Sequence, residues 1–403
     1  MIVRNIIVIN DFAQPTGGAG KVAFDVAIAL AKNGFRVVFF SGTGPESDLL
    51  QNNNIKSVCM QQPDMLSDSN KVRAALRSIW NHKAHKRLCM LLNDYDTTDT
   101  IVMVHGFSKT LSSSIFSSIK KKGFKAIFIL HDYFAACPNG GFYNFQTNEN
   151  CHLVPLSLKC FFCNCDVRSY TQKVYRFIRQ LFVCYNFKNS KGIYAFNVSD
   201  LSKSKMEPYI GSWFECFGTL YSPIDLNYEK KIDIVNNDTY LFIGRLSEEK
   251  GIRDFCKVLT ELSLKGIVLG DGYLREELEQ KYPNIFFAGW VAGDNKVKYI
   301  KQAKCVIFPS KVQETFGLTI AETLSYGLPC IAPKECGASF LIKDGKNGFL
   351  YPMNDYDSLK ACIRSFEKMD MNSFSKNIEQ SFNRNAFSAN TYVNNLIEIF
   401  RKI

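Results

Sequence analysis

Short apolar runs, each the length of a buried strand, alternate with helical segments along most of the chain. The first run, 5–10, is rich in β-branched residues, and a glycine-rich turn at 16–20 leads from it into a helical segment at 22–32 and a second run at 35–40. A strand, a helix and a strand in this order form a βαβ unit, whose strands are parallel. Similar runs follow at 100–104, 126–130 and 193–197. The first half of the chain is therefore predicted to be a doubly wound α/β domain with a parallel sheet.

A second series of the same kind begins after a turn-rich, polar segment at 223–237. Its predicted strands are 240–243, 266–269, 285–288, 305–309 and 329–333. The length of 403 residues suits two domains that each bury a core. We expect an amino-terminal domain at 1–222, a carboxyl-terminal domain at 223–385, and a closing segment at 386–403 with an amphipathic helix at 390–402.

The positive charge of the chain is concentrated in its first half. The formal net charge is +11, and residues 1–222 hold 25 Lys and Arg against 15 Asp and Glu, whereas residues 223–403 hold 24 against 23. This asymmetry suggests that only the first half meets an anionic surface or substrate.

The cysteines and the apolar stretches favour a cytosolic protein. Most of the 14 cysteines stand singly in apolar surroundings, which suits a reducing compartment. The start of the chain is interpreted as a first strand rather than a signal peptide, and the longest apolar stretches fall far short of the roughly 20 residues that a bilayer crossing needs.

The glycine-rich turn after the first strand is a candidate ligand contact. Gly17, Gly18 and Gly20 let the backbone approach a ligand, and the helix that follows can offer its amides to an anion. A Walker motif is excluded by Pro15 and Val22, and the dinucleotide pattern GxGxxG is missing as well. Glycine turns are common in α/β folds, so a purely structural role stays equally open.

Two cations follow the first strand of the second domain. Arg245 and Lys250 lie in the sequence Gly-Arg-Leu-Ser-Glu-Glu-Lys-Gly, at the carboxyl edge of the predicted sheet, where open α/β folds bind ligands. A planar guanidinium and a mobile ammonium together suit a diphosphate. The alternative is that both are solvated and paired with Glu248 and Glu249.

Two carboxylates eight positions apart form the most informative pattern. Glu314 lies in the loop after the strand ending near 309, and Glu322 lies on the helix predicted at 319–326. The turn at 316–318 can present backbone amides at the start of that helix to a phosphate. The carboxylates can then accept hydroxyl hydrogen bonds from a ribose and a hexose at the two ends of one elongated ligand.

Together these motifs resemble family 4 glycosyltransferases of the GT-B fold. The resemblance rests on motifs that run in the expected order from Gly17 to Gly348: Gly-Arg(x4)Lys-Gly at 244–251, Gly-Asp-Gly at 270–272, Glu(x7)Glu at 314–322, Gly337, and Asp-Gly(x2)Gly at 344–348. It implies two Rossmann-like domains that face each other across a cleft, with the closing helix packed back on the first domain. It also implies metal-independent, retaining transfer of a sugar from a nucleotide donor, with no cofactor.

The resemblance assigns roles to residues of the second domain. Arg245 and Lys250 would neutralise the diphosphate, Glu322 would hold the ribose, and Glu314 the transferred sugar. The donor would also contact Phe316 and the backbone amides of Gly317 and Leu318, and Gly18 of the first domain would close over the phosphates.

The first domain would supply the reacting side of the site. Leu-His-Asp at 130–132 resembles the segment in which the family places a histidine beside the reacting sugar, which makes His131 a catalytic candidate together with Arg245, Lys250 and Glu314. His105 also ends a predicted strand and, with Asp132, is expected on the acceptor side. A lone histidine is often structural, but its position at a strand end favours a role at the site.

The expected reaction is transfer of a sugar from a UDP- or GDP-sugar to a glycan or lipid-linked acceptor in surface polysaccharide biosynthesis. Preorganised cations and amides would stabilise the departing diphosphate, and the acceptor hydroxyl would attack from the same face. Two alternatives stay open: a GT-B-like sugar-nucleotide epimerase or hydrolase, and a nucleic-acid-binding protein that uses the basic half. No known nucleic-acid recognition module is present, so no nucleic-acid partner is expected.

A cysteine-rich insertion at about 137–165 departs from the common pattern. Cys160 and Cys163 have the spacing of a metal knuckle, and Cys137 and Cys151 could complete a four-thiolate structural zinc site. The alternative is a loop whose thiols bind no metal.

The segment 168–188 combines cations and aromatic residues at helical spacing. It suits the surface of an anionic membrane, and the basic patches at 120–122 and 83–87 support that interpretation. We therefore expect a cytoplasmic protein in peripheral contact with the inner face of the plasma membrane. The alternative is a helix packed on the core with a solvated basic side.

Overall fold

The computed structural model describes residues 2–188, 190–224 and 232–403. The chain divides into two compact units. Unit 1 comprises residues 1–142, 152–223 and 386–403, and unit 2 comprises residues 143–151 and 224–385. The predicted polar segment at 223–237 lies partly outside the described residues.

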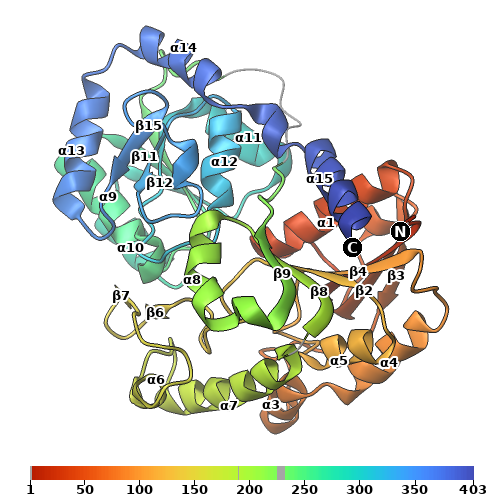
Figure 1. The fold of residues 1–403 in the computed structure, drawn as a ribbon. Coiled ribbons are helices and arrows are strands. Elements are labelled where there is room, and N and C mark those ends of the chain that lie inside the picture. The colour runs from red at the N-terminus through yellow and green to blue at the C-terminus, as the bar shows by residue number, and fades with distance from the viewer. Residues whose placement is uncertain (1, 189, 225–231) are drawn as a thin grey trace. The chain divides into compact units, whose positions relative to one another are not determined.

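Unit 1 is built on one parallel sheet of seven strands (Figure 1). In spatial order the strands are β3 (Lys56–Cys59), β2 (Arg36–Thr43), β1 (Asn5–Phe12), β4 (Thr100–Val104), β5 (Ala126–Leu130), β8 (Ser190–Asn197) and β9 (Phe214–Thr219). The chain starts in the middle of the sheet, because β1 pairs in parallel with both β2 and β4. The order therefore reverses direction between β1 and β4, as in a doubly wound fold.

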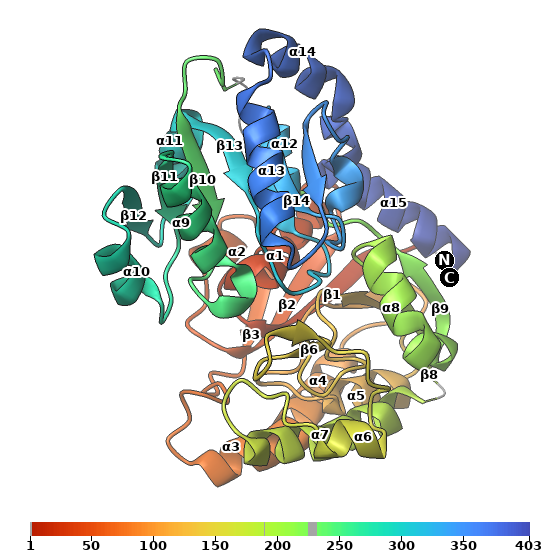
Figure 2. The same cartoon turned by 90° about the vertical axis from the view of Figure 1, so that its left-hand side faces the viewer.

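Helices cover both faces of this sheet, as both views show (Figures 1 and 2). One face packs on α1 (Gly17–Lys32), which in turn contacts the closing helix α15 (Ala389–Lys402). The other face packs on α4 (His82–Leu92), α5 (Ser114–Lys121) and α7 (Tyr170–Phe187). The remaining helices are α2 (Asp48–Gln51), α3 (Lys71–Ile79), α6 (Leu158–Phe162), α8 (Asp200–Ile210) and the 3-10 turn η1 (Gly211–Trp213).

Unit 2 holds a parallel sheet of six strands. In spatial order they are β12 (Ile285–Gly289), β11 (Lys265–Leu269), β10 (Thr239–Ile243), β13 (Ala303–Ile307), β14 (Cys330–Pro333) and β15 (Gly348–Tyr351). Its helices are η2 (Glu248–Lys250), α9 (Ile252–Glu261), α10 (Arg275–Lys281), α11 (Gly293–Gln302), α12 (Leu318–Ser325), η3 (Ser339–Leu341), α13 (Tyr356–Glu367) and α14 (Met371–Ser381), and η4 (Arg384–Phe387) spans the division between the units. The prediction of two doubly wound parallel sheets is confirmed.

Part of the cysteine-rich insertion groups with unit 2 rather than with unit 1, where the sequence placed it. The part that groups with unit 2 is the antiparallel hairpin of β6 (Tyr143–Asn144) and β7 (Glu149–Asn150). The Asn150 Nδ2 donates to the carbonyl of Lys311 at 3.3 Å, and the Tyr143 side chain is fully buried. The cysteines on either side of the hairpin stay in unit 1, except Cys151 at its end.

Helix α7 corrects the expected position of the basic side chains in the segment 168–188, which both interpretations placed on the surface. Its cations face inward: Lys173 and Arg179 are buried, and Arg176 forms an ion pair with the buried Asp166, Nε to Oδ2 3.0 Å. The side chains that face solvent are largely apolar. The cations are buried because the loops under α7 offer them polar partners, such as the Ser108 carbonyl at 3.3 Å from Arg179 Nη1.

No helix in the three described ranges is long and apolar enough to cross a membrane.

The loops after β10 and β13 approach each other closely at one end of the unit 2 sheet, and Gly251 lies at this contact. Gly251 lies between η2 and α9 with a φ of 70°, a left-handed conformation that side chains disfavour. A Cβ there would lie 1.8 Å from the carbonyl oxygen of Pro309, in the loop after β13. Only glycine allows these two loops to touch.

Replacing Gly251 by Ala should therefore destabilise the protein more than the backbone conformation alone explains. Gly345 is the matched control, because it has the same φ of 70° and nothing within 4 Å of a Cβ. We expect Gly345→Ala to cost about 1 to 2 kcal/mol for the left-handed backbone, and Gly251→Ala to exceed it by about 1 to 3 kcal/mol of overpacking. Urea denaturation followed by circular dichroism measures both, and equal losses would contradict the close approach.

Candidate active site

The functional candidates of unit 2 lie where its strand order reverses. β10 and β13 are neighbours in the sheet although two other strands separate them in the sequence. The loop after β10 carries Arg245 and Lys250, and the loop after β13 carries Glu314 and leads into α12. Loops that leave the carboxyl ends of neighbouring strands at such a switch point form the ligand crevice of open α/β sheets.

An ion pair joins the two loops. The Lys250 Nζ contacts the Glu314 Oε1, and the Ser310 hydroxyl donates to the same oxygen at 3.1 Å. Both charged side chains are mostly buried, with 25% and 20% of their surface exposed. A lysine has three N–H donors and a carboxylate several lone pairs, so each retains bonding capacity for a ligand. The structure thus brings together two residues that the sequence separates by 64 positions.

Arg245 is held by its own loop. Its Nη2 pairs with Glu249 Oε1 and its Nε donates to the Ser247 hydroxyl at 3.3 Å, while that hydroxyl donates to Glu249 at 2.8 Å. The alternative that Arg245 and Lys250 pair with Glu248 and Glu249 is therefore correct only for Arg245 and Glu249. Glu248 instead pairs with Arg253. With 64% of its side chain exposed, Arg245 still presents donors to solvent.

The start of α12 has the geometry of an anion site. Gly317 precedes the helix with a φ of 94°, no side chain caps the helix, and its first turn holds no acidic residue. Phe316 is buried and anchors the turn. A Cβ on Gly317 would lie 2.9 Å from Cys336 Sγ, so the turn also packs too tightly for a side chain. The amides of Gly317 and Leu318 therefore lie at the positive end of the helix dipole, as predicted.

Glu322 has a partner that the sequence did not reveal. It lies on α12 and its Oε2 pairs with Lys296 Nζ of α11 at 2.6 Å, with both side chains mostly buried. Lys296 lies in a polar, charged helix where no residue stands out, so no sequence signal marks it. The pair fixes the Glu322 carboxylate and adds a third lysine or arginine to the candidate site.

In unit 1, two of the predicted residues meet. His105 follows β4, His131 follows the neighbouring β5, and the His105 Nδ1 lies 2.9 Å from the His131 Nε2. One ring donates this hydrogen bond and the other accepts it, which requires both to be neutral or only one to be charged. Burial lowers the pKa of His131 to about 4, and burial together with His131 lowers the pKa of His105. Both imidazoles are therefore neutral at pH 7.

A buried carboxylate missed by the sequence analysis positions the loop beyond His105. The Asp11 side chain, at the end of β1, accepts hydrogen bonds from the amides of Lys109, Thr110 and Leu111 at 2.8 to 3.0 Å. Burial raises its pKa even though these amides oppose the shift. The sequence signal was available, since a carboxylate directly after a buried strand requires a partner.

The last two predicted residues of unit 1 lie at loop ends. Asp132 is exposed and accepts from the Phe134 amide at 2.9 Å, and the surrounding protein raises its pKa to about 6 by desolvation, which this amide only partly offsets. Gly18 lies in the first turn of α1, which begins at Gly17, five residues before the predicted start. It is exposed, and no side chain caps this helix start either.

The neutral histidine pair should make the stability of the protein decline in acid. His131 binds a proton near pH 6.5 when unfolded and near pH 4 when folded, so the unfolded state gains protons first as the pH falls. The free energy of unfolding should therefore be constant above pH 7 and decline as the pH falls from 6.5 towards 4. Urea midpoints at pH 7.5, 6 and 5 measure this, and a His105→Gln, His131→Gln double variant should show a smaller decline. An equal decline would contradict the assigned pKa shifts.

The predicted zinc ligands are not gathered into one group. Among the residues that the structure describes, no three His, Cys, Asp or Glu side chains lie close enough together to hold a metal ion. Cys160 and Cys165 instead flank the buried Lys173, whose Nζ lies 3.3 Å from each sulfur. Burial alone would lower the pKa of Lys173, but the two thiols outweigh it and raise the pKa. An ammonium between two sulfurs does not fit a cation site, so zinc stays a prediction without support from these positions.

Metal analysis of the purified protein tests the zinc prediction directly. If the ammonium of Lys173 is the cation of this cluster, the protein should contain far less than one zinc per chain, and Lys173→Met should destabilise it by leaving two buried thiols without a donor. Stoichiometric zinc that is lost on Cys160→Ser or Cys163→Ser would contradict this arrangement and establish the metal site.

Two doubly wound parallel sheets in one chain, with cations, carboxylates and an uncapped helix start at the switch point of the second, define the GT-B class. Residues 226–387 match the family described as glycosyl transferases group 1. The match lies almost entirely in unit 2.

Sequence relatives and solved structures agree with this class. The chain is 34% identical to an uncharacterized glycosyltransferase of Methanocaldococcus jannaschii over 149 residues, which are 32% of this chain and 38% of that protein. It is 29% identical over 157 residues to the UDP-Gal:alpha-D-GlcNAc-diphosphoundecaprenol alpha-1,3-galactosyltransferase of Escherichia coli, covering 35% of this chain and 40% of that enzyme. The matched part thus spans about two fifths of these relatives. HepE of Anabaena, solved with UDP and glucose, shares the fold over 99% of both chains, with a TM-score of 0.67 and 16% identity.

Proposed function

We propose that the protein is a retaining glycosyltransferase that moves a sugar from a UDP- or GDP-sugar to a glycan or lipid-linked acceptor in surface polysaccharide biosynthesis. The observation that carries the proposal is the pairing of Lys250 with Glu314 across the switch point of unit 2, beside the uncapped start of α12. This arrangement offers a cation and amides for a diphosphate next to a carboxylate for hydroxyl groups.

The chemistry follows from the charge that develops when the sugar leaves. The bond from the anomeric carbon to the diphosphate breaks, and its electron pair stays on the phosphate oxygen. Lys250, Arg245 and the amides of Gly317 and Leu318 stabilise that charge, so no divalent ion is needed for the step. The acceptor hydroxyl attacks the same face of the sugar, and the departing phosphate takes its proton. Glu314 holds the sugar hydroxyls and Glu322 the ribose.

The neutral histidines of unit 1 suit the acceptor side of the reaction. A neutral imidazole can accept or donate a hydrogen bond to a sugar hydroxyl without competing as a cation for the diphosphate. In this proposal His131 contacts the reacting sugar, and His105 positions it through their shared hydrogen bond. Asp132, with its raised pKa, lies one residue further along the same loop.

Donor and acceptor classes are supported by the relatives. The Escherichia coli relative is named for a UDP-sugar donor and a diphosphoundecaprenol acceptor, and HepE was solved with UDP and glucose. A lipid-linked acceptor would place the protein in the cytoplasm at the inner face of the plasma membrane, in contact with anionic lipid. A sugar-nucleotide epimerase or hydrolase would instead turn over the donor without any acceptor.

Donor binding tests the assignment of Glu322 and Lys250. Glu322→Gln should weaken UDP- or GDP-sugar affinity by about ten- to a hundredfold, because a buried ribose hydroxyl loses a charged acceptor worth roughly 1 to 3 kcal/mol. Lys250→Ala should reduce turnover at least about tenfold, because it removes a cation from the diphosphate. Isothermal titration calorimetry and release of free nucleotide measure the two effects.

Each variant has a matched control in another ion pair of unit 2. Glu261→Gln breaks the pair with Lys360, whose side chains are exposed to 35% and 22%, and Lys265→Ala breaks the pair with Asp238. Both controls should keep donor affinity and turnover. Unchanged donor affinity in Glu322→Gln, or donor consumption that does not respond to any acceptor, would overturn the proposed assignment.

A further inference from the structure

Helix α7 exposes an apolar stripe to solvent. Ile178, Leu181, Phe182 and Tyr185 follow the helical spacing i, i+3, i+4 and i+7, and all four are exposed, Tyr185 to 79%. The inward face of the same helix carries the buried cations. A surface helix normally has the opposite arrangement, so the stripe requires an explanation other than core packing.

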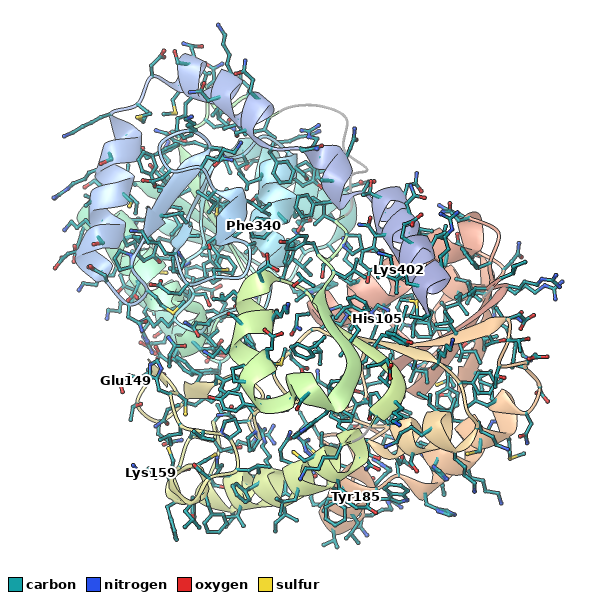
Figure 3. All side chains as sticks on the ribbon, in the orientation of Figure 1. His105, Glu149, Lys159, Tyr185, Phe340 and Lys402 are labelled. Atoms are coloured by element: carbon teal, nitrogen blue, oxygen red, sulfur yellow. The ribbon has the colours of Figure 1, made fainter. Side chains whose placement is uncertain are left out.

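Two neighbouring helices extend this surface. α3 is pinned to α7, since the Tyr175 hydroxyl meets the Ser78 hydroxyl and lies 3.4 Å from the Ala75 carbonyl, and α3 exposes Leu76. α6 also packs on α7 and exposes Phe162 to 72%. Figure 3 shows Tyr185 of α7 and Lys159 of α6 at the outer border of this layer, away from the sheet of unit 1. We call the outward side of α3, α6 and α7 the docking face.

The charge of the docking face has one sign. The sequences of α3, α6 and α7 contain no Asp or Glu. The one acidic residue in 158–188 is Asp166, and the one in 68–80 is Asp68; both are buried in ion pairs with arginines. Lys159, Arg168 and Lys188 are exposed on α6 or at the two ends of α7. Apolar side chains are therefore bordered by cations, with the acids withdrawn into the interior.

We propose that the docking face binds the surface of an anionic lipid bilayer, with the stripe of α7 inserted among the headgroups. Aliphatic and aromatic side chains beside lysines and arginines suit the interface, where rings lie at headgroup depth and cations meet lipid phosphates. A second copy of the chain would bring the same cations against this face, so like charges oppose self-association through it. This inference names the surface that would make the membrane contact of the proposed function. It depends on the proposed function only for the reason why such a contact is needed.

Flotation with vesicles tests the proposal on the full chain. The protein should float with vesicles of phosphatidylcholine and phosphatidylglycerol and not with phosphatidylcholine alone. The triple variant Leu181→Ser, Phe182→Ser, Tyr185→Ser should lose at least about tenfold in partitioning, because it removes the inserted apolar area. The double variant Lys159→Ala, Lys188→Ala should lose about tenfold or more, and higher salt should weaken binding further.

Matched controls lie in unit 2. Tyr273→Ser, Phe286→Ser, Trp290→Ser removes three apolar side chains exposed to 69%, 55% and 78%, and Lys257→Ala, Lys265→Ala removes two exposed lysines. Both should float as well as the parent. Thermal melting of every variant should show a cooperative transition, and the stripe variant and its control should lose similar stability, because the side chains altered in both are only partly exposed.

The outcomes separate this proposal from the proposed function. Thermal stabilisation by a nucleotide sugar should be the same in the parent and in the stripe variant; if the parent shows none but floats, the proposed function fails and the docking face stands. Equal flotation of the stripe variant and its control, or binding to neutral vesicles, would overturn the docking face. So would a concentration-dependent dimer that the stripe variant abolishes, or a salt-dependent shift of DNA in place of flotation.

Discussion

The parallel pairing of β10 with β13 is the contact on which the candidate site depends. Parallel strands cannot be joined by a tight turn, so each is reached through a crossover, and the sheet grows outward from β10 in both directions. At the point of reversal two loops leave side by side with no helix between them. The ion pair of Lys250 with Glu314 and the contact of Gly251 with Pro309 both bridge this gap. Unit 1 repeats the reversal between β1 and β4, where Asp11 fixes the neighbouring loop.

The charges of the candidate site are compensated in pairs. Lys250 meets Glu314, Arg245 meets Glu249, and Lys296 meets Glu322. A pair of this kind holds both side chains at the site without leaving an isolated charge partly buried, which would be costly. Under the proposed function, a diphosphate and a sugar would add hydrogen bonds to groups that are already in place, as preorganised electrostatic catalysis requires.

The central strands, the edge strand β12 and the motif loops were predictable, whereas the other three edge strands and the pairings were not. Runs such as 126–130 are buried on both faces and show as continuous apolar sequence, and they appear as β5. β3, β9 and β15 were not among the predicted strands, and each lies at the edge of its sheet with exposed or partly exposed residues. Glu322 was found by its spacing from Glu314, but its partner Lys296 was not, because only the fold brings α11 and α12 together.

Helix α7 buries its cations and exposes apolar side chains, the reverse of what its sequence indicated. Composition therefore indicated the charge of the domain but not which residues lie on its surface. The excess of cations in 1–222 indicated an anionic partner, and the segment 168–188 was the expected contact. Lys173 and Arg179 nevertheless contact partners in the interior. Lys173 contacts the sulfurs of Cys160 and Cys165, and Arg179 lies over the ring of Phe134. Long side chains can bury a charge when the interior offers acceptors, and the apolar residues at the remaining positions are then forced outward by the helical repeat. The basic residues near the ends of the helix keep the positive sign of this surface, so an anionic partner stays a prediction, carried by other residues than the sequence indicated.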